Sequence, residues 1–179
     1  MASVFGHALT AYALGTSFSE ELRTKKLWIL GILCSILPDA DVLGFKFGIA
    51  YEDFWGHRGF THSFIFAILV GFLITVICYG KKLTSKTGLF LILYFSICTA
   101  SHGILDAMTS GGLGIAFFSP FDNNRYFFPW RPIQVSPIGA SRFFSVWGIK
   151  VLLSELLWIG IPSGCYILAM NILKRKKSS

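Results

Sequence analysis

The chain has 179 residues, a length typical of a single domain. Apolar residues make up 54% of it and charged residues only 14%, and the mean hydropathy of +0.63 excludes an ordinary soluble domain. The formal net charge is +7, but much of the positive charge lies in short segments between apolar runs and at the C-terminus. This distribution is typical of a multi-pass membrane protein, so nucleic acid is not an expected partner.

Five apolar segments follow one another along the chain, and a spanning helix needs about 20 residues. Residues 2–18 predict a short helix, and residues 27–37 with 42–47 predict a segment that crosses or re-enters the membrane. Three further segments approach or reach the spanning length: 64–80, 88–109 and 151–173. We therefore expect an all-α, polytopic membrane helical bundle with about four to five membrane-embedded helices. The polar stretch 110–148 is expected to form one structured extramembrane loop.

Lys and Arg residues indicate the orientation, because they are enriched on the cytoplasmic side of multi-pass proteins. Ten of them lie in two short connections and the C-terminal tail: Arg23, Lys25, Lys26, Lys81, Lys82, Lys86, Lys174, Arg175, Lys176 and Lys177. A path of five crossings with the N-terminus outside places all ten in the cytoplasm. The C-terminus is then cytoplasmic, and the polar motifs described next lie at the outer face.

Residues with metal-binding potential are concentrated in three motifs. These are Leu37-Pro38-Asp39-Ala40-Asp41, Gly56-His57-Arg58-Gly59-Phe60-Thr61-His62-Ser63 and His102-Gly103-Ile104-Leu105-Asp106. His102 and Asp106 are one helical turn apart, so their side chains share a face and can bind one zinc-like ion. A charged Asp106 inside an apolar segment is costly, which itself indicates a function.

The other two motifs offer further ligands. Pro38 disfavours a helix at Leu37, and in an extended or turn backbone one of Asp39 and Asp41 can bind a metal while the other orients a histidine. His57 and His62 flank a glycine-containing turn that can direct both rings inward. Thr61 or Ser63 is expected to cap the helix that follows.

Simpler interpretations exist for single residues. His7 can be an interfacial histidine, Arg58 a lipid-headgroup anchor, and the His102–Asp106 pair a hydrogen bond between helices. They do not explain why all four histidines and three carboxylates gather at one membrane face, so a metal site is the preferred hypothesis. Glu155 lies outside the motifs, in the last apolar segment, and is a candidate partner for Arg142 or Lys150.

These motifs resemble those of the YdjM-like, LexA-regulated, inner-membrane family of metal-dependent hydrolases. The shared pattern comprises Gly6-His7, Leu37 to Asp41, Gly56 to Ser63, Ser101-His-x-x-x-Asp-x-x-Thr-x-x-Gly112 and a Pro-to-Arg loop from Pro120 to Arg131. The resemblance covers most of residues 1–139 and does not extend to the helix at 151–173. It implies one membrane-embedded, hydrolase-like domain over residues 1–179, located in the inner membrane. The family is also distantly similar to zinc-dependent phospholipase C and related zinc nucleases.

The resemblance implies hydrolysis of a phosphoester or lipid-linked phosphate by metal-activated water. The cofactor would be one or two divalent ions, preferably zinc, bound by His7, Asp39, His57, His62, His102 and Asp106. Asp41 would orient a ligand or act as general base, and Arg58, Arg125 and Arg131 would bind the phosphate of a membrane lipid. For Arg125 and Arg131, packing of the loop against the lipid surface is an equal alternative.

Two other classes of function use the same residues. Intramembrane His and Asp also mark the ion pathways of metal or proton transporters, and a non-catalytic membrane regulator can keep a structural metal. A transporter needs a polar path across the membrane, whereas the cytoplasmic halves of these segments carry no matching polar residues.

Overall fold

The computed structural model describes residues 1–137 and 143–178, and its regular elements there are helices. The main helices are α1 (Val4–Gly15), α2 (Lys25–Ile36), α3 (Phe64–Tyr79), α4 (Lys86–Ala107), α6 (Val146–Glu155) and α7 (Ile161–Ser178). Shorter helical segments are η1 (Glu20–Leu22), η2 (Leu37–Phe47), η3 (Phe60–His62), η4 (Gly80–Lys82) and the π-helical η5 (Leu156–Gly160). Two isolated β-bridges, Thr109–Ile133 and Ile115–Tyr126, organise the long loop. The expected all-α bundle is therefore confirmed.

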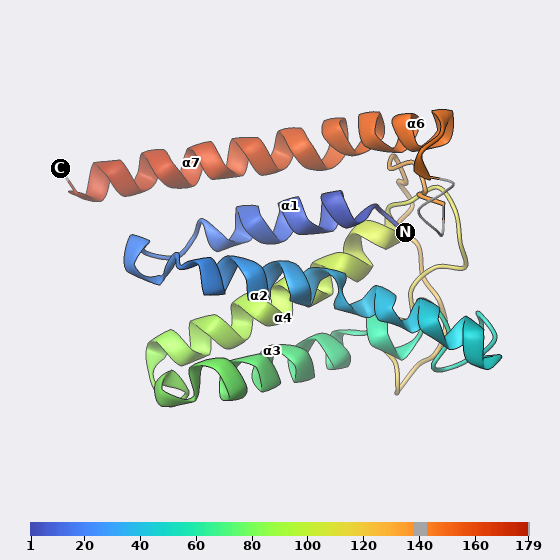
Figure 1. Ribbon diagram of the computed structural model, residues 1–179, viewed down its shortest axis with the longest axis horizontal. Coiled ribbons are helices and arrows are strands. Elements are labelled where there is room, and N and C mark those ends of the chain that lie inside the picture. Colours follow the sequence, from blue (N-terminus) through green and yellow to red (C-terminus); the bar gives the residue numbers. More distant parts are fainter. Residues whose placement is uncertain (138–142, 179) are drawn as a thin grey trace.

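Four helical segments of the described chain are long and apolar enough to cross a membrane. They are Lys25–Phe47, Phe64–Lys82, Lys86–Ala107 and Val146–Lys176. The first of these joins α2 to η2 without a break, so the segment that was expected to cross or re-enter has the length to cross. The twelve residues of α1 are too few to span alone, and this helix packs between α2, α4 and α7 (Figure 1).

Hydroxyl side chains define where the helices begin. Ser3, Thr24, Ser63 and Ser85 precede α1, α2, α3 and α4, and each accepts a hydrogen bond from a backbone N–H of the first turn. Such caps satisfy amide groups that have no partner inside the helix, which matters most where water is scarce. Of the two candidate caps for α3, Ser63 has this role, and Thr61 bonds elsewhere.

The two ends of the bundle differ in chemistry. The α1–α2 connection, the α3–α4 connection and the C-terminus lie at one end, and they carry the clustered Lys and Arg residues (Figure 1). The N-terminus, η2, the end of α4 and the start of α6 lie at the other end. The three polar motifs lie at this second end, because successive helical segments run in opposite directions and the motifs follow α2, precede α3 and end α4.

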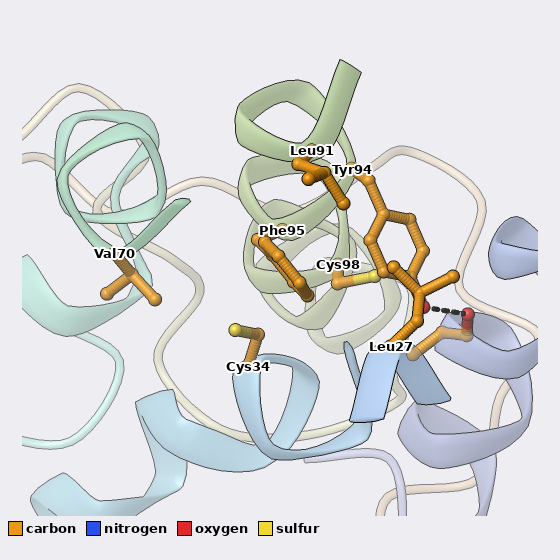
Figure 2. Close-up of a cluster of buried hydrophobic side chains, with 8 residues drawn as sticks. Leu27, Cys34, Val70, Leu91, Tyr94, Phe95 and Cys98 are labelled. Carbon is orange, nitrogen blue, oxygen red and sulfur yellow. Dashed lines mark hydrogen bonds between the residues drawn. The ribbon is translucent and has the colours of Figure 1, made fainter. Parts of the chain in front are cut away.

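An apolar core lies between these ends. Leu27 and Cys34 of α2 pack against Leu91, Phe95 and Cys98 of α4, together with Ala11, Val70 and Tyr94 (Figure 2). The Tyr94 hydroxyl donates to the Ala11 carbonyl at 3.1 Å, which satisfies a polar group inside the core. The buried cysteines thus serve as small apolar side chains, as expected from their isolation in the sequence.

Candidate metal centre

The fold brings the candidate ligands together from four separate segments. His7 lies on α1, Asp39 and Asp41 on η2, His57 and His62 in and just after the 48–59 loop, and His102 and Asp106 in the last turns of α4. Their side chains are almost fully buried, and the side chain of Asp39 is the most accessible, at 12% exposed. All the predicted His and Asp residues are therefore neighbours in space.

Four of these residues form the centre of the cluster: Asp39, His62, His102 and Asp106. Each offers a ligand atom, and the four atoms lie within 4.8 Å of one another. Asp39 Oδ1 is 3.2 Å from His102 Nε2 and 3.7 Å from His62 Nε2, and His102 Nε2 is 4.0 Å from Asp106 Oδ2. We call this group the four-residue centre.

The inward-facing atoms of the four-residue centre have no hydrogen-bond partner. They are both carboxylate oxygens of Asp39, Asp106 Oδ2, and the Nε2 atoms of His62 and His102. Buried polar atoms are almost always paired, because an unpaired one costs the desolvation of the group. Several that converge on one point indicate a missing common partner, and nitrogen with carboxylate oxygen is a donor set that suits zinc.

Asp41 binds the outer side of the histidine pair. Its Oδ1 lies 2.7 Å from His57 Nδ1, and its Oδ2 lies 3.2 Å from His62 Nδ1. Oδ2 also accepts hydrogen bonds from the Thr61 hydroxyl at 2.6 Å and the Arg58 backbone N–H at 3.2 Å. With these donors occupied, Asp41 is placed to fix the orientation of the imidazoles, which is one of the two roles expected for it. Asp41, His57 and His62 form a second, smaller group that can hold an ion.

His102 is oriented by a backbone group. Its Nδ1 lies 2.7 Å from the carbonyl oxygen of Ser35, an acceptor, so this nitrogen carries the proton and Nε2 is free to bind a metal. His7 stacks on His102 with ring centroids 3.8 Å apart, and its Nε2 lies 3.4 Å from Asp106 Oδ1. Neither ring nitrogen of His7 has a hydrogen-bond partner.

Arg58 is fully buried, which rules out the alternative of a lipid-headgroup anchor. It donates from Nη1 to the Gly111 carbonyl at 2.8 Å and from Nη2 to Thr109 Oγ1 at 3.1 Å, and its Nε faces Asp106 Oδ2 at 3.3 Å. Its backbone has φ 68°, an uncommon conformation for a residue with a side chain. These contacts tie the octapeptide to Asp106 and to the turn after α4.

The other two arginines lie farther out. Arg125 donates to the carbonyl oxygens of His57, Tyr51 and Asp53 at 2.8, 2.9 and 3.2 Å, so it holds the loop that carries His57. The guanidinium of Arg131 lies over the Phe127 ring, 4.5 Å from its centroid. Both contacts are those of loop packing, and a role in phosphate binding stays a prediction for them.

The carboxylates of the site favour positive charge at His62. Burial by itself lowers the pKa of His62, but its contacts with the carboxylates of Asp39 and Asp41 outweigh burial and raise the pKa to about 9. The same carboxylates would stabilise a bound cation.

One local expectation was wrong. Pro38 does not interrupt the chain, because it occupies the first turn of the 3₁₀ segment η2, where a missing N–H costs nothing. A 3₁₀ helix has three residues per turn, so residues two apart point in different directions. Asp39 can therefore face the four-residue centre while Asp41 faces the outer nitrogens of the histidines.

Several supporting groups were not recognised from the sequence as parts of the site. Ser35 contributes only its carbonyl, which carries no signal in the residue type. Thr109 and Gly111 belong to the turn that binds Arg58, and the Thr-x-x-Gly pattern at 109–112 was their only sequence signal. Ser3 and Glu155 bond to each other beside α1.

Comparison with known proteins identifies the family of this chain. The family described as YdjM inner membrane protein matches residues 1–177. The chain is also similar to the Inner membrane protein YbcI of Escherichia coli (strain K12), with 36% identity over 176 residues, covering 98% of this chain and 100% of that protein. No solved structure matches it. The chain therefore belongs to the YdjM inner membrane protein family and is a multi-pass protein of the inner membrane.

Proposed function

We propose that this protein is a membrane-bound metal-dependent hydrolase that acts on a phosphoester or lipid-linked phosphate. The observation that carries the proposal is the convergence of buried ligand atoms that have no hydrogen-bond partner in the four-residue centre. A purely structural polar cluster would satisfy its atoms internally, because each unpaired atom costs stability. This cluster instead presents a nitrogen- and oxygen-lined position to an external cation.

Asp39, His62, His102 and Asp106 would hold the ion, with His7 beside Asp106 as a further candidate. A divalent metal supplies Lewis-acid chemistry there, which lowers the pKa of water enough for hydrolysis near neutral pH. A second ion near Asp41 and His57 would compete with their 2.7 Å contact, so we favour one tightly held ion.

The residues around the centre would keep this geometry in place. Asp41 holds the outer nitrogens of His57 and His62, and the Ser35 carbonyl fixes the ring of His102. The Arg58 guanidinium lies 3.3 Å from Asp106 Oδ2 and would hold this carboxylate in position at the centre. Arg58 thus acts here through Asp106.

The substrate class rests on the resemblance to zinc-dependent phospholipases and on the setting of the site. The centre lies at one end of a membrane bundle, and Asp39 is its most accessible member, so a substrate would approach on the side of η2. Exposed apolar residues follow η2 and the next loop, among them Leu43, Phe47 and Trp55. Such side chains suit a lipid interface, where a lipid-linked phosphate would be presented.

The orientation proposed for the site is the outer face of the inner membrane. Clustered Lys and Arg residues occupy the opposite end of the bundle, and such clusters are retained in the cytoplasm.

Transport of a metal or proton is the main alternative, and it requires a polar path to the basic end. In the described chain, the apolar core of Leu27, Cys34, Leu91, Phe95 and Cys98, drawn in Figure 2, lies along α2 and α4 between the centre and that end. This packing favours a closed pocket at one face over a conducting path.

The test is metal content and hydrolysis, measured together on detergent-purified protein. Wild type, His102→Ala and the control Asp122→Asn, a half-buried loop position outside the centre, would be compared by elemental mass spectrometry and with phospholipid and phosphomonoester substrates. We expect bound zinc and hydrolysis in wild type and the control, and loss of both in His102→Ala. Folded wild type with no bound metal would refute the proposal, whereas bound metal with ion flux in proteoliposomes and no hydrolysis would favour transport.

A further inference from the structure

Glu155 is a buried acidic residue that the proposed mechanism does not use. It ends α6, immediately before the π-helical turn η5, and only 4% of its surface is exposed. Within the described residues it forms no ion pair with Lys150, one of its two candidate partners, and the other, Arg142, lies outside the described residues. An acidic side chain inside a membrane bundle is costly and is retained where it has a task.

Both carboxylate oxygens of Glu155 accept hydrogen bonds from one residue at the opposite end of the chain. Ser3 donates its backbone N–H to Oε1 and its hydroxyl to Oε2, the latter at 2.5 Å. Ser3 is also the N-cap of α1, where its Oγ accepts from the Gly6 N–H and its carbonyl accepts from the His7 N–H. Glu155 therefore holds the residue from which α1 begins.

Close packing at Gly6 supports this connection. A Cβ at Gly6 would lie 2.9 Å from Ile159 Cδ1 and 3.2 Å from Glu155 Cδ. A side chain at this position would displace the end of Ile159 and press on Glu155, so the glycine keeps α1 close to the last helix. Two positions about one helical turn apart, Ser3 and Gly6, thus hold the first turn of α1 against the segment of Glu155 and Ile159.

This first turn carries groups of the metal centre. The Ala2 N–H donates to Asp106 Oδ1 at 2.6 Å, and His7 Nε2 lies 3.4 Å from the same oxygen. Because neither ring nitrogen of His7 has a hydrogen-bond partner, its position depends on where α1 is placed and on the stacking with His102. Whatever anchors α1 therefore sets the position of His7 at the centre.

We infer that Glu155 is a positioning residue for the metal centre: by binding Ser3 it anchors the first turn of α1 and so places Ala2 and His7 against Asp106. The inference rests on the proposed metal-dependent function for its importance, but the anchor itself is a property of the metal-free protein. The last helical segment carries none of the family motifs, and anchoring α1 would be its contribution to the site.

The test has two readouts on the full-length protein in detergent. The first is hydrogen–deuterium exchange of the peptide covering residues 2–10 in the metal-free state, and the second is the zinc Kd by competition with a chelator. The variants are Glu155→Ala, Ser3→Ala and the double variant, with Glu155→Gln as the conservative change. Ser154→Ala is the matched control, because Ser154 lies on the same turn of α6 but bonds to the Gln134 N–H and the Val151 carbonyl.

We expect faster exchange in residues 2–10 and about tenfold or greater weakening of zinc binding in Glu155→Ala, with a smaller loss in Glu155→Gln. The effects of Ser3→Ala and Glu155→Ala should be less than additive, because both remove the bond between the Ser3 hydroxyl and the Glu155 carboxylate. Ser154→Ala should leave both readouts near wild type.

Unchanged exchange in a folded Glu155→Ala protein would refute the anchor. Faster exchange with an unchanged zinc Kd would refute the positioning role, since the anchor would then not reach the metal. A wild-type protein that binds no zinc would refute the proposed function and the positioning role together, while the exchange data would still decide on the anchor. If Glu155→Ala does not fold, Glu155→Gln and Ser3→Ala carry the same comparison.

Discussion

The two ring nitrogens of His62 face two different carboxylates: Nδ1 lies 3.2 Å from Asp41 Oδ2, and Nε2 lies 3.7 Å from Asp39 Oδ1. The first carboxylate has other hydrogen-bond donors, whereas neither oxygen of the second has a hydrogen-bond partner. This difference separates a carboxylate that orients a ligand from one that is free to bind a metal, and it leads to the first prediction.

Asp39→Asn and Asp41→Asn should have different effects on zinc. Removing a proposed ligand should leave little bound zinc, while removing the orienting carboxylate should weaken binding by about 10- to 100-fold. Zinc titration followed by elemental analysis checks this: at saturating zinc, Asp41→Asn should regain metal and Asp39→Asn should not. Equal losses in both variants would contradict the division of roles.

Gly112→Ala should destabilise the protein more than Gly48→Ala. Both glycines have positive φ, 95° and 76°, so both substitutions carry a backbone cost of about 1–3 kcal/mol. A Cβ at Gly112 would also meet the Nη1 atom of Arg58, whereas at Gly48 nothing lies within 4 Å. Thermal unfolding in detergent measures the difference, and equal melting temperatures would show that Arg58 can move without loss.

Zinc binding should release protons and strengthen with rising pH. The metal-free site raises the pKa of His62 to about 9 from 6.5, so near pH 7.5 this ring holds a proton that zinc must displace. From His62 alone, the apparent affinity should rise by about tenfold per pH unit and level off above about pH 9. Calorimetry in buffers of different ionisation enthalpy counts the released protons, and a pH-independent affinity would exclude His62 as a ligand.

The stability of the metal-free protein should change with pH in the opposite direction to zinc affinity, and fall as the pH rises. Because the folded pKa of His62 is raised, its contact with the two carboxylates stabilises the fold fully below about pH 6.5, and this contribution is lost as the pH passes through about 9. Metal-free protein should therefore lose stability over this range, while zinc-loaded protein should not. Melting temperatures with and without chelator give the comparison.

The topology can be tested from both ends of the bundle. With the basic end of the bundle in the cytoplasm, a fluorescent protein fused to the C-terminus should fluoresce there. A cysteine introduced at Asp122, a partly exposed loop residue, should react with a membrane-impermeant maleimide in intact cells from which the outer membrane barrier has been removed. The native cysteines must first be replaced, because Cys165 is exposed and would also react. Labelling of residue 122 only after lysis would place the centre on the cytoplasmic side.

Much of the architecture follows from the sequence, because membrane helices form wherever apolar segments are long enough to satisfy their own backbone. The segments 64–80 and 88–109 agree closely with α3 and α4, and the last helix begins a few residues earlier than expected, at Val146. The identity of the candidate ligands also came from the sequence, since His and Asp stand out in apolar surroundings. The one-turn spacing of His102 and Asp106 was sufficient to place both on one face of α4.

Tertiary structure alone decided the roles within the site. Whether Asp39 or Asp41 faces the centre depends on the 3₁₀ twist of η2, which Pro38 did not reveal. The burial of Arg58, the Ser35 carbonyl on His102 and the bond between Ser3 and Glu155 join segments that are distant in the chain. A sequence fixes which side chains are available and how they repeat along a helix, but the direction of each nitrogen and oxygen is set by the packing of α1, α2, α4 and α6 against one another.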